Sequence, residues 1–244
     1  YVLFFMFFFF FTDAESNLST DTVLEQIDLN EDQVYIERLN DLNQHSEMDL
    51  SYHTSILPFI KQYTEHDKRL ISKMLTLGKY YFNIFEPILD KYNLPLELKY
   101  LAVVESSLNP KARSGSGATG LWQFMYLTGK QYNLNVTSYV DDRQDPIKST
   151  EAACKYFEKL YEIFGDWNLV LAAYNGGPNY IQRKMFSTGI NNYWDLQPHL
   201  RKETRNYIPK FIAINYAMNF AADYQIKPLD LKIELLNVDT ITLR

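Results

Sequence analysis

Apolar residues recur three and four positions apart through most of this chain of 244 residues. The pattern is continuous over residues 33–92, in VYIERLNDL and then in TSILPFIKQYTEHDKRLISKMLTLGKYYFNIFEPILDKY. This spacing places apolar and aromatic side chains on one face of an α-helix. The alternation typical of a β-strand occurs only near the C-terminus, in PLDLKIELLNVDTITLR. The sequence therefore predicts a mainly α fold, and a hydrophobic content of 46% is enough to build its core.

Composition divides the chain into five segments. Residues 1–14 begin with YVLFFMFFFFF, an apolar run as long as a signal-peptide core but shorter than the ~20 residues of a transmembrane helix. We expect a signal peptide or its remnant there, and hence an exported protein of the periplasm or cell envelope; an uncleaved membrane anchor is the alternative. Residues 15–32 are predicted as a polar linker, residues 33–92 as a helical N-terminal extension, residues 93–225 as a second helical unit and residues 226–244 as a tail.

Charge and ligand content argue against several classes of function. A net charge of −6 without a basic run disfavours a nucleic-acid partner. The single cysteine, Cys154, allows no intrachain disulfide and is expected in the core. The four histidines are scattered without ligand spacing, so neither a metal site nor a cofactor is expected.

Prolines and capping residues divide residues 93–225 into helices and loops. Pro95 is predicted to open a helix that ends at the NP of VVESSLNP, and the following RSGSGATG is predicted as a glycine-rich loop. Asp145 is expected to cap a helix whose first residue is Pro146. The segment LRKETRNYIPKFIAINYAMNF is expected to form a helix or a helix pair broken near Pro209.

A glutamate lies inside the apolar stripe of the helix that follows Pro95. At about 100° per residue, Leu98, Leu101, Ala102 and Leu108 share one face, and Glu105 falls near its centre. Burial disfavours the charged form of a carboxyl group, so its pKa should rise, as a general acid near neutral pH requires. A structural glutamate paired with an arginine or a tyrosine is the alternative.

Polar and aromatic residues downstream carry groups suited to a sugar. Ser106, Ser114 and Gln123 can hydrogen-bond a carboxyl group or a polar substrate. Trp122 and Tyr174 offer flat apolar faces that suit sugar rings. Spacing alone leaves open both a carbohydrate-active glutamate and a structural one.

Three ordered motifs resemble those of a known family. The segment ESSLNPKARSGSGATGLWQFM is followed by AAYNGGP and then by ETRNYIPKFIA. Over roughly residues 90–220, these motifs are similar to the goose-lysozyme-like catalytic domain of the family 1 lytic transglycosylases, of the membrane-bound lytic murein transglycosylase D type. The resemblance implies a lysozyme-like helical domain that acts on peptidoglycan strands without a cofactor. It also implies cleavage of the β-1,4 bond between N-acetylmuramic acid and N-acetylglucosamine.

The same resemblance implies roles for individual residues. Glu105 is implied to be the catalytic acid and then the base. The residues implied to bind the substrate or line the site are Ser106, Ser114, Gln123, Met125, Tyr174, Asn175 and Tyr207. Glu203 is implied to support the site from the last helices.

No second catalytic carboxylate stands out beside Glu105, although most glycosidases use a pair. Glu97 falls in the first turn of its helix, and Asp145 is an expected cap. Asp141 and Asp142 share a polar turn with Arg143 and are expected to pair with it. The resemblance implies a mechanism with one glutamate, assisted by the substrate's N-acetyl group, that yields 1,6-anhydromuramoyl ends. The alternatives are a hydrolytic goose-type lysozyme and a non-catalytic glycan-binding protein.

Overall fold

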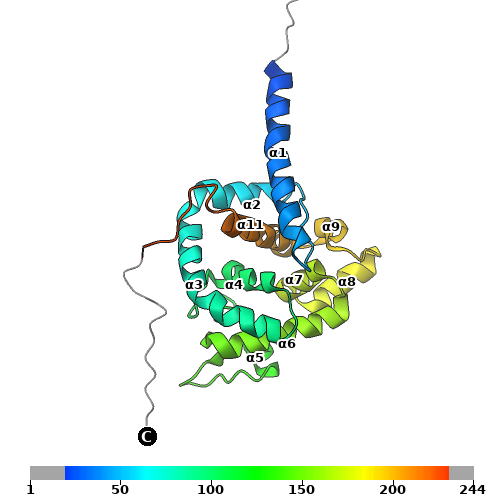
Figure 1. The fold of residues 1–244 in the computed structure, drawn as a ribbon. Coiled ribbons are helices and arrows are strands. Elements are labelled where there is room, and N and C mark those ends of the chain that lie inside the picture. The colour runs from blue at the N-terminus through cyan, green and yellow to red at the C-terminus, as the bar shows by residue number, and fades with distance from the viewer. Residues whose placement is uncertain (1–19, 231–244) are drawn as a thin grey trace, which may run out of the picture.

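The computed structural model describes the backbone of residues 20–230 and the side chains of residues 32–230 (Figure 1). Regular structure in this part of the chain is helical, and extended pairing is limited to isolated bridges such as the one between Thr119 and Phe124. The mainly α fold class predicted from the sequence is confirmed. The expected signal segment, residues 1–14, lies outside the described residues, as does most of the expected tail.

The longer helices are α1 (Thr20–Gln44), α3 (Lys68–Lys91), α6 (Pro146–Phe164), α7 (Trp167–Gly176), α8 (Pro178–Thr188) and α11 (Tyr207–Asn219). The shorter ones are α2 (Leu57–Lys61), α4 (Lys99–Ser106), α5 (Tyr126–Gln131), α9 (Tyr193–Leu196) and α10 (Lys202–Arg205). A π-helical turn, η1 (Gln62–His66), and the 3₁₀ turns η2 (Leu96–Leu98), η3 (Asp142–Gln144) and η4 (Gln197–His199) complete the described helices. Among the described residues, no helix combines the length and the apolar character needed to cross a bilayer.

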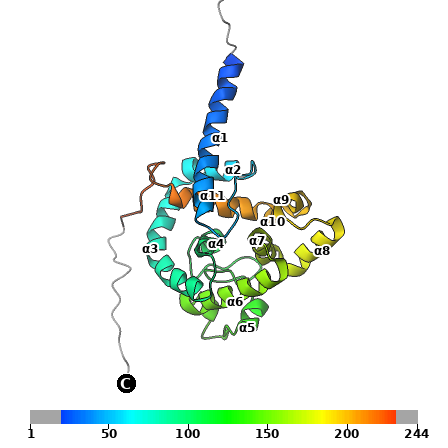
Figure 2. The same ribbon diagram turned by 45° about the vertical axis from the view of Figure 1, so that its right-hand side comes forward.

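Helices α4 and α7 lie at the centre of the molecule. Figures 1 and 2 show them enclosed by α3, α6, α8 and α11. In α7 every residue from Trp167 to Ala173 is buried, and α4 buries Tyr100 to Val103. Because the central helices have little contact with solvent along these stretches, their C-terminal ends are held in fixed positions.

The C-terminal part of α1 is fastened to the end of α11 by Arg38. Its guanidinium donates a hydrogen bond to the hydroxyl of Tyr216 at 2.9 Å, pairs with Asp223 at 2.8 Å and lies 5.1 Å from the ring centre of Phe220. The segment 20–32, expected to be linker, forms helix together with the residues after it. The division into an extension and a second unit at residue 92 stays a prediction.

Capping residues set several helix boundaries as the sequence predicted. The side chain of Asp145 accepts hydrogen bonds from the backbone N–H groups of Ile147 and Lys148, and Pro146 is the first residue of α6. The break expected near Pro209 lies at Asn206, between α10 and α11. Pro209 sits in the first turn of α11, where a missing N–H breaks no intrahelical hydrogen bond.

The glycine-rich loop between α4 and α5 is organised by the buried Arg143. Its guanidinium donates to the carbonyl oxygens of Gly117 at 3.1 Å and Phe124 at 3.2 Å, and it pairs with Asp141 at 2.7 Å. Gly120 has a φ of +90°, and its backbone passes so close to Arg143 that a Cβ would overlap the carbonyl oxygen of Arg143. The loop therefore has one packing arrangement, fixed by a cation that donates to two loop carbonyls and pairs with Asp141.

Two glycine substitutions distinguish the free-energy cost of backbone strain from the cost of the close contact between Gly120 and Arg143. Gly117 has a φ of +87°, similar to that of Gly120, but open space where its Cβ would lie. We expect Gly117→Ala to lower the free energy of unfolding by ~1 kcal/mol through strain alone. Gly120→Ala should cost about 3 kcal/mol or more, because overlap adds to strain. Urea unfolding followed by circular dichroism measures both, and equal losses would contradict the packing described for Gly120.

Candidate active site

Glu105 lies in the last turn of α4, on the face that the sequence predicted to be apolar. Leu98, Leu101, Ala102 and Leu108 are all buried, so the expected stripe is confirmed. Helix α4 ends at Ser106 because the next residue adopts a left-handed conformation. Glu105 itself is partly exposed as a residue, although its carboxyl group lies deep enough for burial to dominate its titration.

The hydroxyl of Tyr207 donates a hydrogen bond to Glu105 Oε1. Tyr207 is the first residue of α11 and is buried, whereas Glu105 lies in the last turn of α4, 102 positions earlier in the chain. The tyrosine partner that the sequence left open as a structural alternative is therefore present. Such a bond orients the carboxyl group and is compatible with proton transfer through its other oxygen.

Burial raises the pKa of the Glu105 carboxyl group to about 7. The hydrogen bond from Tyr207 opposes this rise in pKa because it stabilises the ionised form, and the negative charge of Glu203 adds to the rise. Near neutral pH, both the protonated and the ionised form of Glu105 are therefore populated. A group in this state can give up a proton and take one back.

Tyr174 of α7 holds the loop against Glu105. Its hydroxyl donates to the carbonyl oxygen of Trp122 at 2.6 Å, and its ring stacks on Phe157 with 5.1 Å between centres. Burial, together with the charge of Glu105, raises the pKa of Tyr174 well above its ordinary value. The phenol therefore stays neutral, and it links the GLWQF segment to the central helix α7.

Trp122 itself does not face a ligand. It has 0% exposure, donates from Nε1 to Thr150 Oγ1 at 2.9 Å, and packs 5.2 Å from Phe85. The expectation that Trp122 offers a flat face to sugar is wrong, because the side chain fills the core between α3 and α6. Cys154 is also buried, as predicted.

Asn175 is held by a residue that the sequence did not identify. Thr204 of α10 is buried and donates from Oγ1 to Asn175 Oδ1 at 2.9 Å. A Cβ on Gly176 would lie 3.1 Å from Thr204 Oγ1, so a small residue there suits this contact. Thr204 lies inside the ETRNY motif, and its position was the only signal that could have marked it.

Ser106 and Gln123 connect the loop to α4. Ser106 Oγ lies 2.9 Å from the carbonyl oxygen of Ala102 and 3.0 Å from that of Leu121. Gln123, with a φ of +48°, donates from Nε2 to the carbonyl of Gly120 at 2.9 Å. These contacts position the loop beside Glu105, and the substrate contacts of both residues stay predictions.

The remaining predicted site residues lie at the surface. Ser114 is exposed, and its hydroxyl accepts a hydrogen bond from the backbone of Ala118 at 3.0 Å. Met125, at the end of the loop, keeps 45% of its surface exposed. Glu203 is exposed on α10, three residues before the turn at Asn206 that leads to Tyr207. Their proposed substrate contacts are likewise untested by the geometry.

The acidic residues that the sequence set aside have structural partners. Asp141 pairs with Arg143, as expected, whereas Asp142 pairs with Lys148 at 2.8 Å instead. Asp145 caps α6. Within the part of the chain that the structure describes, no group of three or more His, Cys, Asp or Glu residues could hold a metal ion.

Comparisons with known proteins give matches to transglycosylases. Residues 82–197 match the family model described as Transglycosylase SLT domain. The membrane-bound lytic murein transglycosylase D of Escherichia coli (strain K12) is 35% identical over 142 residues, covering 56% of this chain and 31% of that protein. A transglycosylase of Enterobacteria phage PRD1 is 37% identical over 90 residues, covering 36% of this chain and 32% of the phage protein. The chain thus spans about a third of the length of these relatives.

Among solved structures, the 70 kDa soluble lytic transglycosylase SLT70 of Escherichia coli is similar with a TM-score of 0.48 and 25% sequence identity. The similarity covers 59% of this chain and 26% of that chain. The SLT match spans Glu105, the glycine-rich loop and Tyr174. Residues 82–197 of this chain therefore match the transglycosylase SLT domain, in agreement with the lytic transglycosylase family that the sequence motifs resembled.

Proposed function

We propose that this protein is a lytic transglycosylase that cleaves the β-1,4 bond between N-acetylmuramic acid and N-acetylglucosamine in peptidoglycan. The observation that carries the proposal is the state of Glu105, whose buried carboxyl group has a pKa of about 7 and which lies within the residues that match the SLT domain model. The Escherichia coli relative is named for its action on murein, which supports glycan strands of peptidoglycan as the substrate.

The same relative is named membrane-bound, which supports a place in the cell envelope for this protein. Export through residues 1–14, or membrane association through their apolar run, stays a prediction because those residues lie outside the described part of the chain.

In the first step, protonated Glu105 gives its proton to the oxygen of the glycosidic bond. The bond from C1 of muramic acid to that oxygen breaks, and glucosamine leaves with a free 4-hydroxyl. The carbonyl oxygen of the substrate's own N-acetyl group supplies electrons to C1, which removes the need for a second carboxylate. Tyr207 stabilises the carboxylate that Glu105 becomes, since it already donates to Oε1.

In the second step, ionised Glu105 takes the proton of the C6 hydroxyl of muramic acid. The C6 oxygen attacks C1 and closes a 1,6-anhydro ring, so no water is consumed and Glu105 returns to its protonated form. A pKa near 7 suits both steps, because neither form of the carboxyl group is strongly favoured near neutral pH.

A hydrolytic goose-type lysozyme is the second candidate. The observation that favours it is Glu203, a second carboxylate whose charge acts on Glu105 and which is exposed, so it could orient a water molecule. Hydrolysis would leave reducing muramic acid ends instead of anhydro ends.

The products and the Glu105→Gln variant test the reaction. We expect purified sacculi treated with the parent protein to release anhydromuramoyl fragments, each lighter by one water than the reducing fragment. Glu105→Gln should lower the rate by about 10³-fold or more, because the variant can neither give nor take the proton. Mass spectrometry of the digest is the measurement. Glu97→Gln, in the 3₁₀ turn η2 before α4, is the matched control and should retain the parent rate.

Reducing ends in the digest would instead identify a lysozyme. Equal cleavage by the parent and Glu105→Gln would rule out the acid role. A lack of cleavage by the parent, with binding to sacculi retained, would favour a glycan-binding protein.

Two variants should move the pH profile in opposite directions. Cleavage by the parent requires protonated Glu105 at the start, so kcat/KM should fall as pH rises through its pKa of about 7. Tyr207→Phe removes the bond that lowers the pKa of Glu105, which should move this fall to higher pH. Glu203→Gln removes the charge that raises the pKa, which should move it to lower pH. Initial rates of sacculus clearing across pH 5–9 measure the shifts; shifts in the same direction would contradict the electrostatics.

A further inference from the structure

We propose that one side of α8, together with Arg201, binds carboxylate groups of the acidic peptide branch of the glycan strand. We call this the donor surface: Tyr180, Arg183, Lys184 and Arg201. The inference rests on the proposed function, since it names a second part of the same polymer that Glu105 is proposed to cleave.

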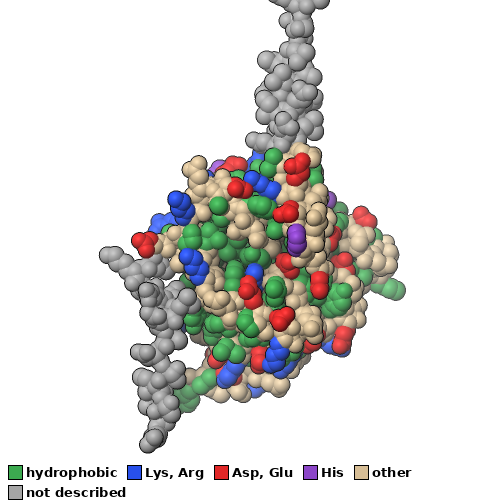
Figure 3. All heavy atoms as spheres, viewed as in Figure 1, with side chains coloured by type: hydrophobic (Ala, Val, Ile, Leu, Met, Phe, Trp, Pro, Cys, Tyr) green, Lys and Arg blue, Asp and Glu red, His purple; other side chains and the backbone are tan. Residues whose placement is uncertain are grey.

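The donor surface is basic in a chain that is acidic overall. The chain holds 30 acidic and 24 basic residues, yet residues 167–194 contain Arg183 and Lys184 and no acidic residue. On the face shown in Figure 3, acidic and basic side chains are mixed instead. A local excess of positive charge on such a background favours an anionic ligand.

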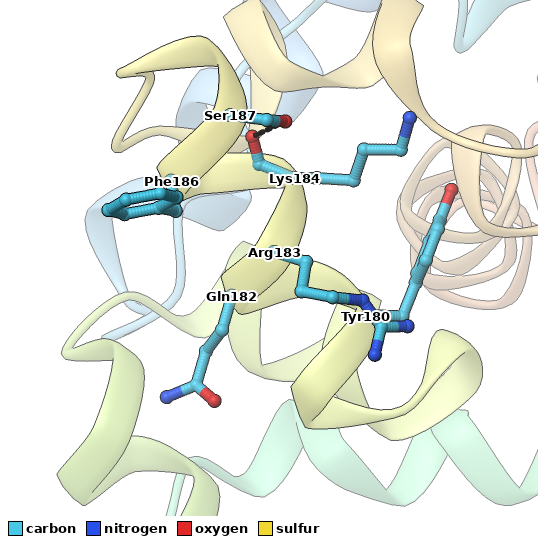
Figure 4. A pocket seen from close by; sticks show the side chains of 6 residues that line it. All are labelled: Tyr180, Gln182, Arg183, Lys184, Phe186 and Ser187. Atoms are coloured by element: carbon cyan, nitrogen blue, oxygen red, sulfur yellow. Dashed lines mark hydrogen bonds between the residues drawn. The ribbon is translucent and has the colours of Figure 1, made fainter.

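Helical spacing and the side-chain directions bring the donors together. Tyr180, Arg183 and Lys184 are three and four positions apart on α8, which places them on one side of the helix. Figure 4 shows these three side chains extending to the same side, whereas Phe186 and Gln182 extend to the other. An open depression of about 680 Å³ along α8 is lined by these three residues and also by Gln182, Phe186 and Ser187.

Arg201 is held in place beside this side of α8. Its guanidinium lies 4.2 Å from the ring centre of Tyr180 and donates to the carbonyl oxygen of Gly176 at 3.1 Å. The backbone N–H of Arg201 donates to the hydroxyl of Tyr180 at 2.8 Å. A stacked guanidinium with a fixed orientation loses less freedom on binding than a free one, so its remaining N–H groups are preorganised donors.

In the part of the chain that the structure describes, the three cations lack carboxylate partners. None of Arg183, Lys184 and Arg201 forms an ion pair with a described aspartate or glutamate. Guanidinium and ammonium groups are donors without acceptor capacity. A ligand that matches them must therefore supply acceptors and negative charge, as a carboxylate does.

The position of the donor surface relative to Glu105 favours a peptide branch. Gly176, which accepts from Arg201, follows Asn175 directly, and α8 begins at Pro178. Arg183 is then ~8 Å along α8 from its start, at 1.5 Å per residue. In peptidoglycan, the peptide leaves from the muramic acid whose C1 is attacked, and it carries free carboxylates. Tyr174, two positions before Gly176, donates to the carbonyl oxygen of Trp122, and Ser106, next to Glu105, bonds that of Leu121. The start of α8 is thus connected to the end of α4, and we infer that the anionic branch of a strand bound at Glu105 extends to the donor surface.

Anionic lipid headgroups share the charge but fit the arrangement less well. A membrane contact would be expected to combine the cations with the exposed aromatic residue of α8, Phe186, which is 92% exposed. Figure 4 shows that Phe186 extends away from Arg183 and Lys184. A flat bilayer surface would contact either the two cations or Phe186, and not both, so we favour the peptide branch as the ligand.

The test compares cleavage of sacculi that carry peptides with cleavage of glycan strands from which an amidase has removed them. The variant is Arg183→Gln/Lys184→Gln, and the matched control is Lys79→Gln/Lys155→Gln, which removes the same charge from exposed positions of α3 and α6. The quantity compared is kcat/KM on peptide-bearing sacculi divided by kcat/KM on peptide-free strands. We expect this ratio to fall about fivefold in the variant, because two exposed charge contacts are lost. The control should keep the parent ratio. Added salt should lower the parent ratio towards that of the variant.

An unchanged ratio in the variant would overturn the inference. If the variant with an unchanged ratio also pellets more weakly with vesicles of phosphatidylglycerol and phosphatidylethanolamine, the donor surface is a lipid site instead. If the parent protein cleaves neither substrate, the proposed function fails. Co-sedimentation of the protein with each of the two polymers then tests carboxylate binding independently of cleavage. In that experiment, preferential binding to the peptide-bearing polymer that the variant loses would support the donor surface.

Discussion

The hydrogen bond between Tyr207 and Glu105 joins the two helices on which the site depends. A carboxyl group enclosed by protein is costly when it is charged, and a donor from the first residue of α11 compensates part of that cost. The bond forms only because α11 packs on both central helices, α4 and α7. The fastening of α11 to α1 through Arg38 extends this dependence to the N-terminal helix. The chemistry of one carboxyl group is thus set by the packing of the whole helical body.

A second constraint is the irregular loop between α4 and α5, which lacks the hydrogen-bond ladder of a helix. Its carbonyl groups are satisfied by the buried Arg143, and its central segment is fixed by Tyr174 and by the burial of Trp122. Buried polar groups that are fully paired specify one conformation, because each alternative leaves a donor or acceptor unpaired. The loop can therefore keep one conformation without regular secondary structure.

Local sequence patterns predicted the helices well, but they predicted the contact partners of individual side chains poorly. The cap of α6 at Asp145 was predicted because an N-cap is an interaction between residues two or three apart. The aromatic residues show the limit: Trp122 and Tyr174 looked equally suited to a sugar, yet one fills the core and the other holds a backbone carbonyl. Asp142 was expected to pair with its neighbour Arg143, but α6 brings Lys148 closer. Periodicity assigns a face to a residue and leaves its partner undetermined.

By itself, the sequence determined the mainly α class, the place of Glu105 on a buried helical face and the motifs of an SLT domain. These properties depend on spacings of a few residues, which a chain carries in any conformation. Only the tertiary structure decided that Tyr207 bonds Glu105, that Thr204 holds Asn175, and that Arg201 stacks on Tyr180. Each of those pairs is separated by 20 or more positions, so the contact exists only after the helices have packed. The raised pKa of Glu105 belongs to the same class, because burial is a property of the packed body.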